Sequence, residues 1–178
     1  MGQRRTEVLQ AAIELLDEAG LDALTMRLLA SRLGVRASAL YRHYPSKQAL
    51  LDAMVASLVG PASALPADAP WEELLRGAAS GMRDVMLSHR DGARLISGFH
   101  DPGPEAIAVF ENLVEALAGA GVTTETATVA VDTVLAYANG FTTEEQARKT
   151  GWPREERDRA FGAGLDLIIT GIKESLPS

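Results

Sequence analysis

The chain has 178 residues, of which 47% are hydrophobic and 23% are charged, and its formal net charge is −7. This apolar content excludes a disordered chain, and no apolar run approaches the roughly 18 residues that a membrane-spanning helix needs. The sequence contains no cysteine, which excludes disulfides, thiolate zinc sites and cysteine nucleophiles. Because the first residues also lack the apolar core of a signal peptide, we expect a soluble, cytoplasmic protein with no membrane partner.

The charge is unevenly distributed along the chain. Residues 1–47 contain seven Lys or Arg against five Asp or Glu, a net charge of +2, whereas the remaining residues contain ten against nineteen, a net charge of −9. A basic head on an acidic body restricts any attraction to phosphate to one end of the molecule. The segment GVRASALYRHYPSK, residues 34–47, gathers basic and aromatic side chains and is the part that we expect to contact a polyanion.

Apolar residues at helical spacing predict four helices in the head and its continuation. The third is very short, at seven or eight residues, and Leu28, Leu29 and Leu33 are predicted to form the apolar side of the second. Suitable capping or terminating residues stand at the helix ends, namely Gly20 after the first helix, Thr25 before the second, Gly34 after it, Pro45 after the third and Ser46 before the fourth.

Two helices joined by a tight glycine-containing turn and supported by a preceding helix form a helix-turn-helix pattern, whose second helix enters the major groove of DNA. Val35, Leu40 and Tyr44 are predicted to face the head core. Small side chains let a helix approach base edges, and the fork of Arg42 suits guanine. The predicted DNA-binding residues are Thr25, Arg27, Arg36, Ala37, Ser38, Ala39, Tyr41, Arg42, His43 and Lys47. The alternative is a solvated charged face on a packed helical subdomain.

The rest of the chain is also predicted to be helical, so the expected fold class is all-α. Pro61, Pro66 and Pro70 mark a break between two lobes. The predicted helices of the second lobe are 71–87, a short helix within 88–97, 104 to 119 or 121, 123 or 124 to about 147, and 154–176. We expect a DNA-binding domain over residues 1–47 and a regulatory, ligand-binding and dimerisation domain over 48–178.

Small residues at helical spacing on the last two predicted helices indicate a homodimer seam. They are Ala136, Gly140, Gly164 and Gly171, with Leu165, Ile168 and Ile172 supplying buried area. The alternative is that the small residues pack within one subunit. A dimer would space two recognition helices about 34–36 Å apart, as successive major grooves of a palindrome require.

A mostly apolar effector cavity is predicted in the second lobe, where flexible methionines suit an adaptable pocket. Its predicted ligand-binding residues are Met82, Met86, Ile96, Phe99, His100, Asn112, Leu113, Val131, Asp132 and Leu135, with Phe110 and Leu117 as further lining. Ordinary core packing is the alternative for each apolar one. Burial of Asp132 would cost several kcal/mol, so it is either hydrogen-bonded for structure or positioned for a polar or cationic ligand group. His89 is expected to tie a helix end.

Residues 5–60 closely resemble the DNA-binding domain of the TetR family of bacterial transcriptional regulators, above all at LTMRLLASRLGVRASALYRHYPSKQALLDAM. The resemblance implies phosphate contacts for Thr25, Tyr41 and Lys47, and base contacts for most of the other DNA-binding residues named above. The second lobe resembles the tetracycline repressors at LSHRDGAR, FENL and FGAGLDLIITGIKESL.

Departures from the tetracycline repressors concern the ligand. The metal-binding histidine of that group would fall at Ile96, its aromatic pocket residue at Met82, its glutamine at Leu113 and its entrance histidine near Ser63. The inserted helix before the last helix is also missing. We therefore expect no metal, no cofactor and no tetracycline–Mg²⁺ complex, although Glu144 or Glu145 could match an acidic pocket-edge residue.

Together these features predict a homodimeric transcriptional repressor that binds a palindromic double-stranded DNA operator and is released by a small, largely apolar effector. The alternative is a helix-turn-helix protein without small-molecule control, with an architectural or division-related role and a solid second lobe. An enzyme is not expected, because His43, His89 and His100 are scattered and no catalytic or phosphate-binding motif is present.

Overall fold

The computed structural model describes residues 2–62, 69–148, 151 and 153–176. Within these residues the fold is all-α, with no strand, as predicted. The helices are α1 (Gly2–Ala19), α2 (Met26–Arg32), α3 (Ala37–Tyr41), α4 (Lys47–Ala62), α5 (Trp71–Ser88), α6 (Gly92–Ser97), α7 (Pro104–Ala118), α8 (Thr124–Arg148) and α9 (Arg154–Glu174). None of them is long and apolar enough to cross a membrane.

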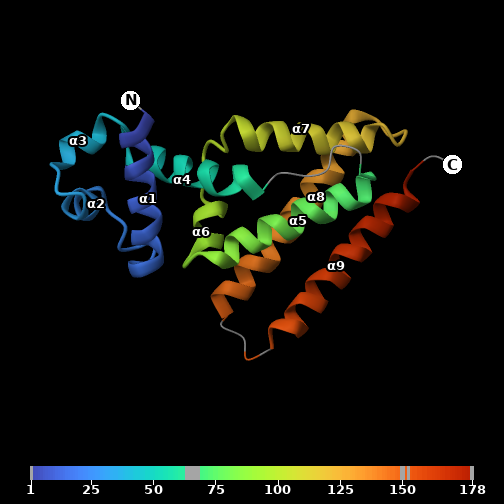
Figure 1. The fold of residues 1–178 in the computed structure, drawn as a ribbon. Helices are drawn as coiled ribbons and strands as arrows, with labels where there is room; N and C mark the ends of the chain where they lie inside the picture. Colours follow the sequence, from blue (N-terminus) through green and yellow to red (C-terminus); the bar gives the residue numbers. More distant parts are fainter. Residues whose placement is uncertain (1, 63–68, 149–150, 152, 177–178) are drawn as a thin grey trace.

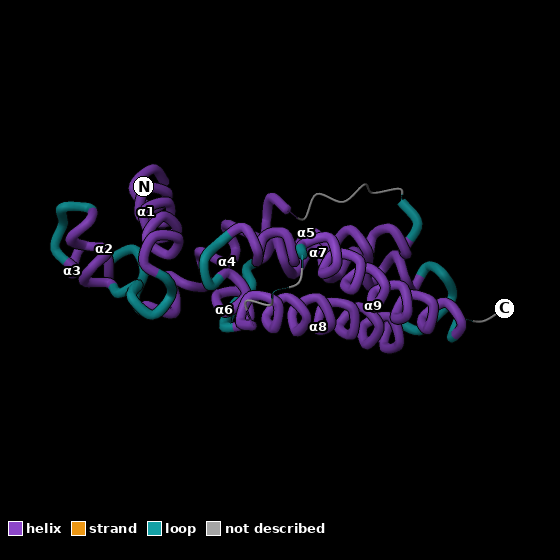
Figure 2. The backbone as a smooth tube through the Cα atoms, turned by 90° about the horizontal axis from the view of Figure 1, so that it is seen from below, coloured by secondary structure: helices purple, strands orange, loops and turns teal. Residues whose placement is uncertain are grey.

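The helices form a small head and a larger body. Helices α1, α2 and α3 lie at one end, α4 runs from this head into the body, and α5 to α9 make up the rest (Figures 1 and 2). The predicted proline break is only partly tested, because α4 continues through Pro61 to Ala62, and Pro66 and Ser63 lie outside the described residues.

Most of the predicted caps and stops of the head helices are present, although the end of α3 differs. The backbone N–H of Leu28 donates to Thr25 Oγ1 at 3.1 Å, and that of Ala49 donates to Ser46 Oγ at 3.0 Å. Gly20 and Gly34 have φ values of +86° and +63°, which favour glycine after a helix. Helix α3 is five residues long, shorter than predicted.

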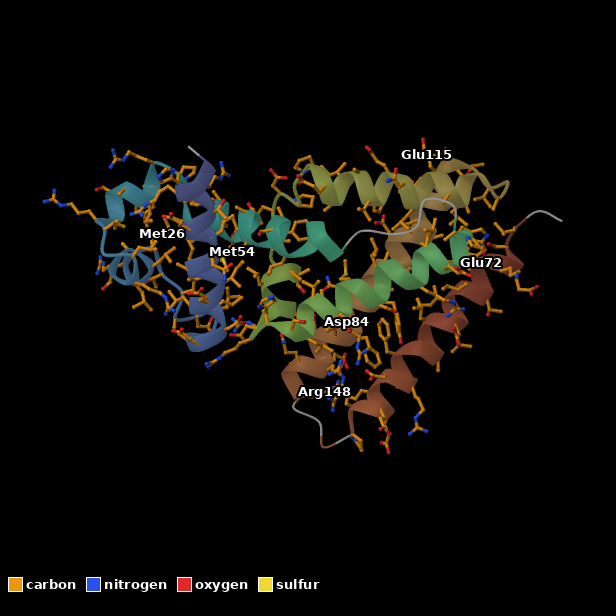
Figure 3. The ribbon with its side chains drawn as sticks, in the orientation of Figure 1. Met26, Met54, Glu72, Asp84, Glu115 and Arg148 are labelled. Atoms are coloured by element: carbon orange, nitrogen blue, oxygen red, sulfur yellow. The ribbon has the colours of Figure 1, made fainter. Side chains whose placement is uncertain are left out.

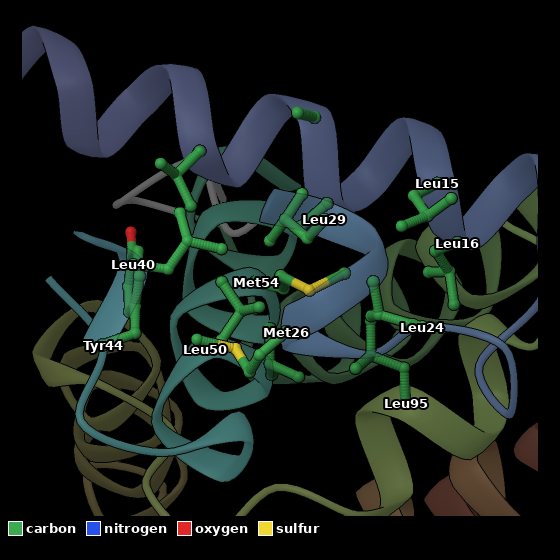
Figure 4. Close-up of a cluster of buried hydrophobic side chains, with 14 of the residues drawn as sticks. Leu15, Leu16, Leu24, Met26, Leu29, Leu40, Tyr44, Leu50, Met54 and Leu95 are labelled. Atoms are coloured by element: carbon green, nitrogen blue, oxygen red, sulfur yellow. The ribbon is translucent and has the colours of Figure 1, made fainter. Parts of the chain in front are cut away.

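A continuous apolar core holds the head together (Figure 4). Tyr44 at 0% exposure and Leu40 at 2% turn inward from α3 and the turn after it, as predicted. The prediction for Leu28 was wrong, since 42% of it is exposed and only the neighbouring positions of α2 face the core. Leu95 of α6 is also in this core, so the body contributes directly to the packing of the head.

Helix α4 belongs to both parts of the molecule. Leu50, Met54 and Val55 lie in the head core, and Val55 also lines a cavity in the body together with Val59, one turn further on. A change in the direction of α4 would therefore move the head relative to the cavity. The domain boundary after residue 47 stays a prediction.

The body is organised around α8, which packs against α5, α7 and α9. A second apolar core fills the space between these helices, with Val131, Val134 and Ala138 of α8 at 0% exposure. This packing leaves the short helix α6 between the body and the head, in contact with α4, α5 and α8.

Candidate functional site

The outer face of α3 and the residues beside it form an exposed polar surface. Ser38 and Arg42 are exposed, and Tyr41 is 48% exposed. Thr25, Arg27 and Arg36 are also exposed, whereas Ala37, Ala39, His43 and Lys47 are partly buried. All ten predicted DNA-binding residues therefore lie within the compact head, on or next to α2 and α3, although Thr25 Oγ1 already caps α2.

The arginines of this surface have no acidic partner among the described residues, whereas Lys47 is close enough to Asp22 to help lower the pKa of that carboxyl. Arg27, Arg36, Arg42 and Lys47 are absent from every ion pair that the described part of the chain forms. Arg32 of α2 differs, because its guanidinium donates to Glu18 at 2.7 Å, which lowers the pKa of that carboxyl. The head thus neutralises Arg32 and leaves the charges of Arg27, Arg36 and Arg42 available to phosphate.

A cavity of about 540 Å³ lies in the body between α4, α5, α6, α7 and α8. Its lining is Val55, Val59, Ala78, Met82, Val85, Ile96, Phe99, Pro102, Ala106, Ile107, Val109, Phe110, Leu113, Asp132, Leu135, Ala136 and Asn139. Seven of the residues predicted for the cavity are therefore among its walls, namely Met82, Ile96, Phe99, Phe110, Leu113, Asp132 and Leu135.

The other predicted ligand-binding residues do not line this cavity. Met86 and Val131 are at 0% exposure in the two apolar cores, so the alternative of ordinary packing applies to them, as it does to Leu117. Asn112 is exposed on α7. His100 is exposed, and its backbone N–H donates to Asp52 Oδ1 at 2.9 Å.

Asp132 lines the cavity, but it is not buried. The cost that burial would carry therefore does not arise, because Asp132 is an exposed residue of the cavity lining. Phe99 and Ile107 are also exposed lining residues, at 40% and 45%.

Sequence reasoning missed several lining residues, of which Asn139 is the most informative. Ser97 Oγ of α6 donates to Asn139 Oδ1 at 2.8 Å, so α6 is held at the cavity wall. Asn139 follows Leu135 by one helical turn and Asp132 by two, so its spacing could have revealed it. Gln146 of α8 connects to the end of α5, because its side-chain N–H groups donate to the carbonyls of Met86 and His89 at 3.1 and 3.0 Å.

Polar contacts connect the cavity region to the head. His89 Nδ1 lies 2.9 Å from Asp17 Oδ2 of α1, and the Arg90 backbone N–H donates to the other oxygen of Asp17 at 3.0 Å. The guanidinium of Arg94 binds Asp22 through two hydrogen bonds of 2.8 and 3.1 Å and lowers the pKa of that carboxyl. His89 therefore ties the end of α5 to α1, in agreement with its predicted role at a helix end.

The geometry does not favour a metal at the cavity. The described residues contain no group of three His, Asp or Glu side chains placed to hold an ion. Glu145 accepts hydrogen bonds from Arg83 at 2.9 and 3.0 Å and from Arg157 at 2.6 Å. Both of its oxygens are occupied by guanidinium groups, so it is not a free pocket-edge ligand.

The predicted dimer seam divides into inward and outward residues. Leu165 is 2% exposed in the core of its own subunit, and a side chain at Gly164 would collide with the ring of Tyr137. The alternative of packing within one subunit is therefore correct at these two positions. Gly140 and Gly171 are exposed with nothing near them, and Leu167, missed in the sequence, is 76% exposed.

Comparisons with known protein families match the head and the body separately. Residues 8–54 match the family described as bacterial regulatory proteins, tetR family, and residues 65–157 match the tetracyclin repressor-like C-terminal domain. The chain belongs to the TetR family. This TetR-family protein is 38% identical to the tetracycline repressor protein class A from transposon 1721 of Escherichia coli, over 79% of this chain and 66% of that protein.

Two solved structures are similar to this TetR-family protein over nearly its whole length. One is TetR-Q116A from Acinetobacter baumannii AYE in complex with minocycline, with a TM-score of 0.87 and 34% identity over 97% of this chain and 98% of that chain. The other is BioQ with its double-stranded DNA operator, with a TM-score of 0.81 and 34% identity over 94% of this chain and 96% of that chain.

Proposed function

We propose that this TetR-family protein is a homodimeric transcriptional repressor that binds a palindromic operator and is released from it by a small, largely apolar effector. The observation that carries the proposal is the pairing of two features at opposite parts of one chain. Basic side chains without acidic partners surround the exposed face of α3, and the body contains an apolar cavity of about 540 Å³. The cavity favours effector control over a DNA-binding protein with a solid body.

Operator binding rests on the chemistry of α3 and its neighbours. Arg42 is proposed to contact guanine in the major groove, while Lys47 and Tyr41 contact phosphate. Two copies of α3 are needed, because one short helix offers too few base contacts to discriminate. Outward-facing Leu167 and Val129, at 76% and 61% exposure, support pairing of two subunits through α8 and α9.

Release is proposed to follow from the shared position of α4 and α6. Val55 and Val59 of α4 and Ile96 of α6 line the cavity, while Leu50 and Leu95 of the same two helices pack in the head core. An effector that fits a different direction of α4 better would change the spacing of the two heads. The fraction of dimers whose two heads fit adjacent major grooves would then decrease, and with it the affinity for the operator.

The DNA-binding roles are tested by matched alanine variants in a fluorescence anisotropy titration of operator and scrambled duplexes. Arg42→Ala should relax the preference for guanine by about 1–3 kcal/mol, whereas Lys47→Ala should weaken binding to all sequences and reduce the salt slope by about one. Arg76→Ala, on a residue of α5 outside the head and outside the cavity lining, serves as the control. Equal losses on every duplex for both head variants would contradict the proposed roles.

A further inference from the structure

We propose that the cavity selects lipophilic organic cations, and that Asp132 is the residue that distinguishes them from neutral molecules of the same shape. This inference rests on the proposed function of the cavity as the effector site. It adds the chemical class of the effector, a protonated amine or quaternary ammonium on an apolar skeleton.

The lining itself shows the charge preference. Asp132 is the one charged side chain among the lining residues, and none of them is basic. Nearly all the others are aliphatic, aromatic or methionine side chains, and Asn139 is already engaged by Ser97. A ligand with an anionic group would meet a carboxylate and no counter-charge, whereas a neutral ligand would leave that carboxylate unused.

Asp132 has no internal partner to compete with a ligand. It makes no ion pair or side-chain hydrogen bond with any residue that the structure describes, in contrast to Glu145, Asp158 and Asp22, which all bind guanidinium groups. The structural role that the sequence left open is therefore unsupported. Asp132 lines the cavity and is exposed in the single subunit that the structure describes, so its carboxylate is not sealed in either apolar core.

Three further features favour a cation. Phe99 and Phe110 are in the lining, and the faces of aromatic rings attract cationic groups that have left water. The body also has an excess of acidic residues, which raises the local concentration of cations. Helix α8 contains a single basic residue among its described positions, Arg148, four helical turns beyond Asp132.

Nile blue and Nile red test the inference, because they share one fused aromatic skeleton and differ in that the first is a cation and the second is neutral. Dissociation constants would be measured by fluorescence titration of the full chain in low salt. Wild-type protein should bind Nile blue about fivefold more tightly, and Asp132→Asn should remove that preference while leaving the affinity for Nile red within about twofold. Added salt should weaken the preference.

Asp84→Asn is the matched control. Asp84 is an exposed residue of α5, a helix that also lines the cavity, but it is not itself a lining residue (Figure 3). This variant should keep the preference for Nile blue. The variant Ala106→Trp should fill part of the cavity and weaken the binding of both dyes, which would show that they bind there. Circular dichroism would check that this variant is folded.

The inference would be overturned by three results: equal or tighter binding of Nile red to the wild type, a cation preference that persists in Asp132→Asn, or no binding of either dye. Failure of the proposed function gives a different result. In that case Nile blue would bind with the Asp132-dependent preference, but saturation of the cavity would leave operator affinity unchanged in the anisotropy assay.

Discussion

Replacement of Arg83 by alanine should destabilise the body strongly, because this residue joins α5 to α8 through a buried ion pair and to α9 through a second, partly exposed one. The side chains of Arg83 and Glu145 are 7% and 5% exposed, and the guanidinium donates to Glu145 at 2.9 and 3.0 Å and to Asp158 at 2.7 Å. The guanidinium carbon also lies 4.9 Å from the centre of the Phe161 ring. Although desolvation opposes its charge, the hydrogen bonds from Arg83 to the two carboxylates raise its pKa.

The magnitude follows from what the substitution leaves behind. Removing one partner of a buried ion pair costs about 3–5 kcal/mol, because the other charge is left without compensation. Here Arg157 still donates to Glu145 at 2.6 Å, and Asp158 is 45% exposed, so we expect the lower end of that range, about 3 kcal/mol. This loss of stability also includes the van der Waals contacts of the aliphatic part of the Arg83 side chain, which alanine cannot make.

The assay is urea denaturation followed by circular dichroism at one fixed protein concentration, because subunit association would shift the midpoint. Arg76→Ala is the matched control, two helical turns earlier on α5. Arg76 pairs with Asp166, but the two side chains are 41% and 59% exposed, so the expected loss is below about 1 kcal/mol. If Arg83→Ala lowered the free energy of unfolding no more than Arg76→Ala, the buried ion pair of Arg83 and Glu145 would not be a main source of the body's stability.

Two further substitutions probe close packing and charge. Gly164→Ala should destabilise the protein by about 1–3 kcal/mol in the same assay, because the new methyl group meets the ring of Tyr137. The control Gly162→Ala has open space and should be neutral or stabilising. Equal effects of the two substitutions would contradict the close contact between Gly164 and Tyr137. The hydrogen bonds from Arg94 hold the pKa of Asp22 below 3.8, so this pair contributes stability above that pH and loses it as the pH falls through the lower folded value. In an NMR titration, Arg94→Ala should raise the pKa of Asp22 toward 3.8, and an unchanged value would refute the cause.

Much of the head could be predicted because its signals are local. Thr25 and Ser46 cap the helices that follow them, and Gly34 has the positive φ that its position after α2 indicated. Leu40 and Tyr44 point into the core because they lie one helical turn apart in the segment before Pro45. Leu28 was predicted to be buried because it is next to Leu29. Only one side of α2 packs against the core, and the periodic pattern did not show which of the two adjacent leucines is on that side.

The cavity was less predictable. Val131 and Leu135 are apolar residues one turn apart on α8, yet the first is buried in the core and the second lines the cavity. Their surroundings are set by α5 and α7, whose positions no short stretch of sequence specifies. The same holds for Val59, which lines the body cavity one turn after Val55, a residue that also packs in the head core.

The amino-acid sequence alone determined the all-α fold class, the beginnings or ends of most described helices, and the concentration of positive charge at one end with a helix-turn-helix. These properties follow from helix capping and apolar spacing, which act over a few residues. Only the tertiary structure decided which arginines have acidic partners: Arg32 and Arg83 have them, whereas Arg27, Arg36 and Arg42 do not. It also decided that Asp132 lines the cavity. Ion pairing and cavity shape depend on residues far apart in the chain, so they are settled only when the helices pack.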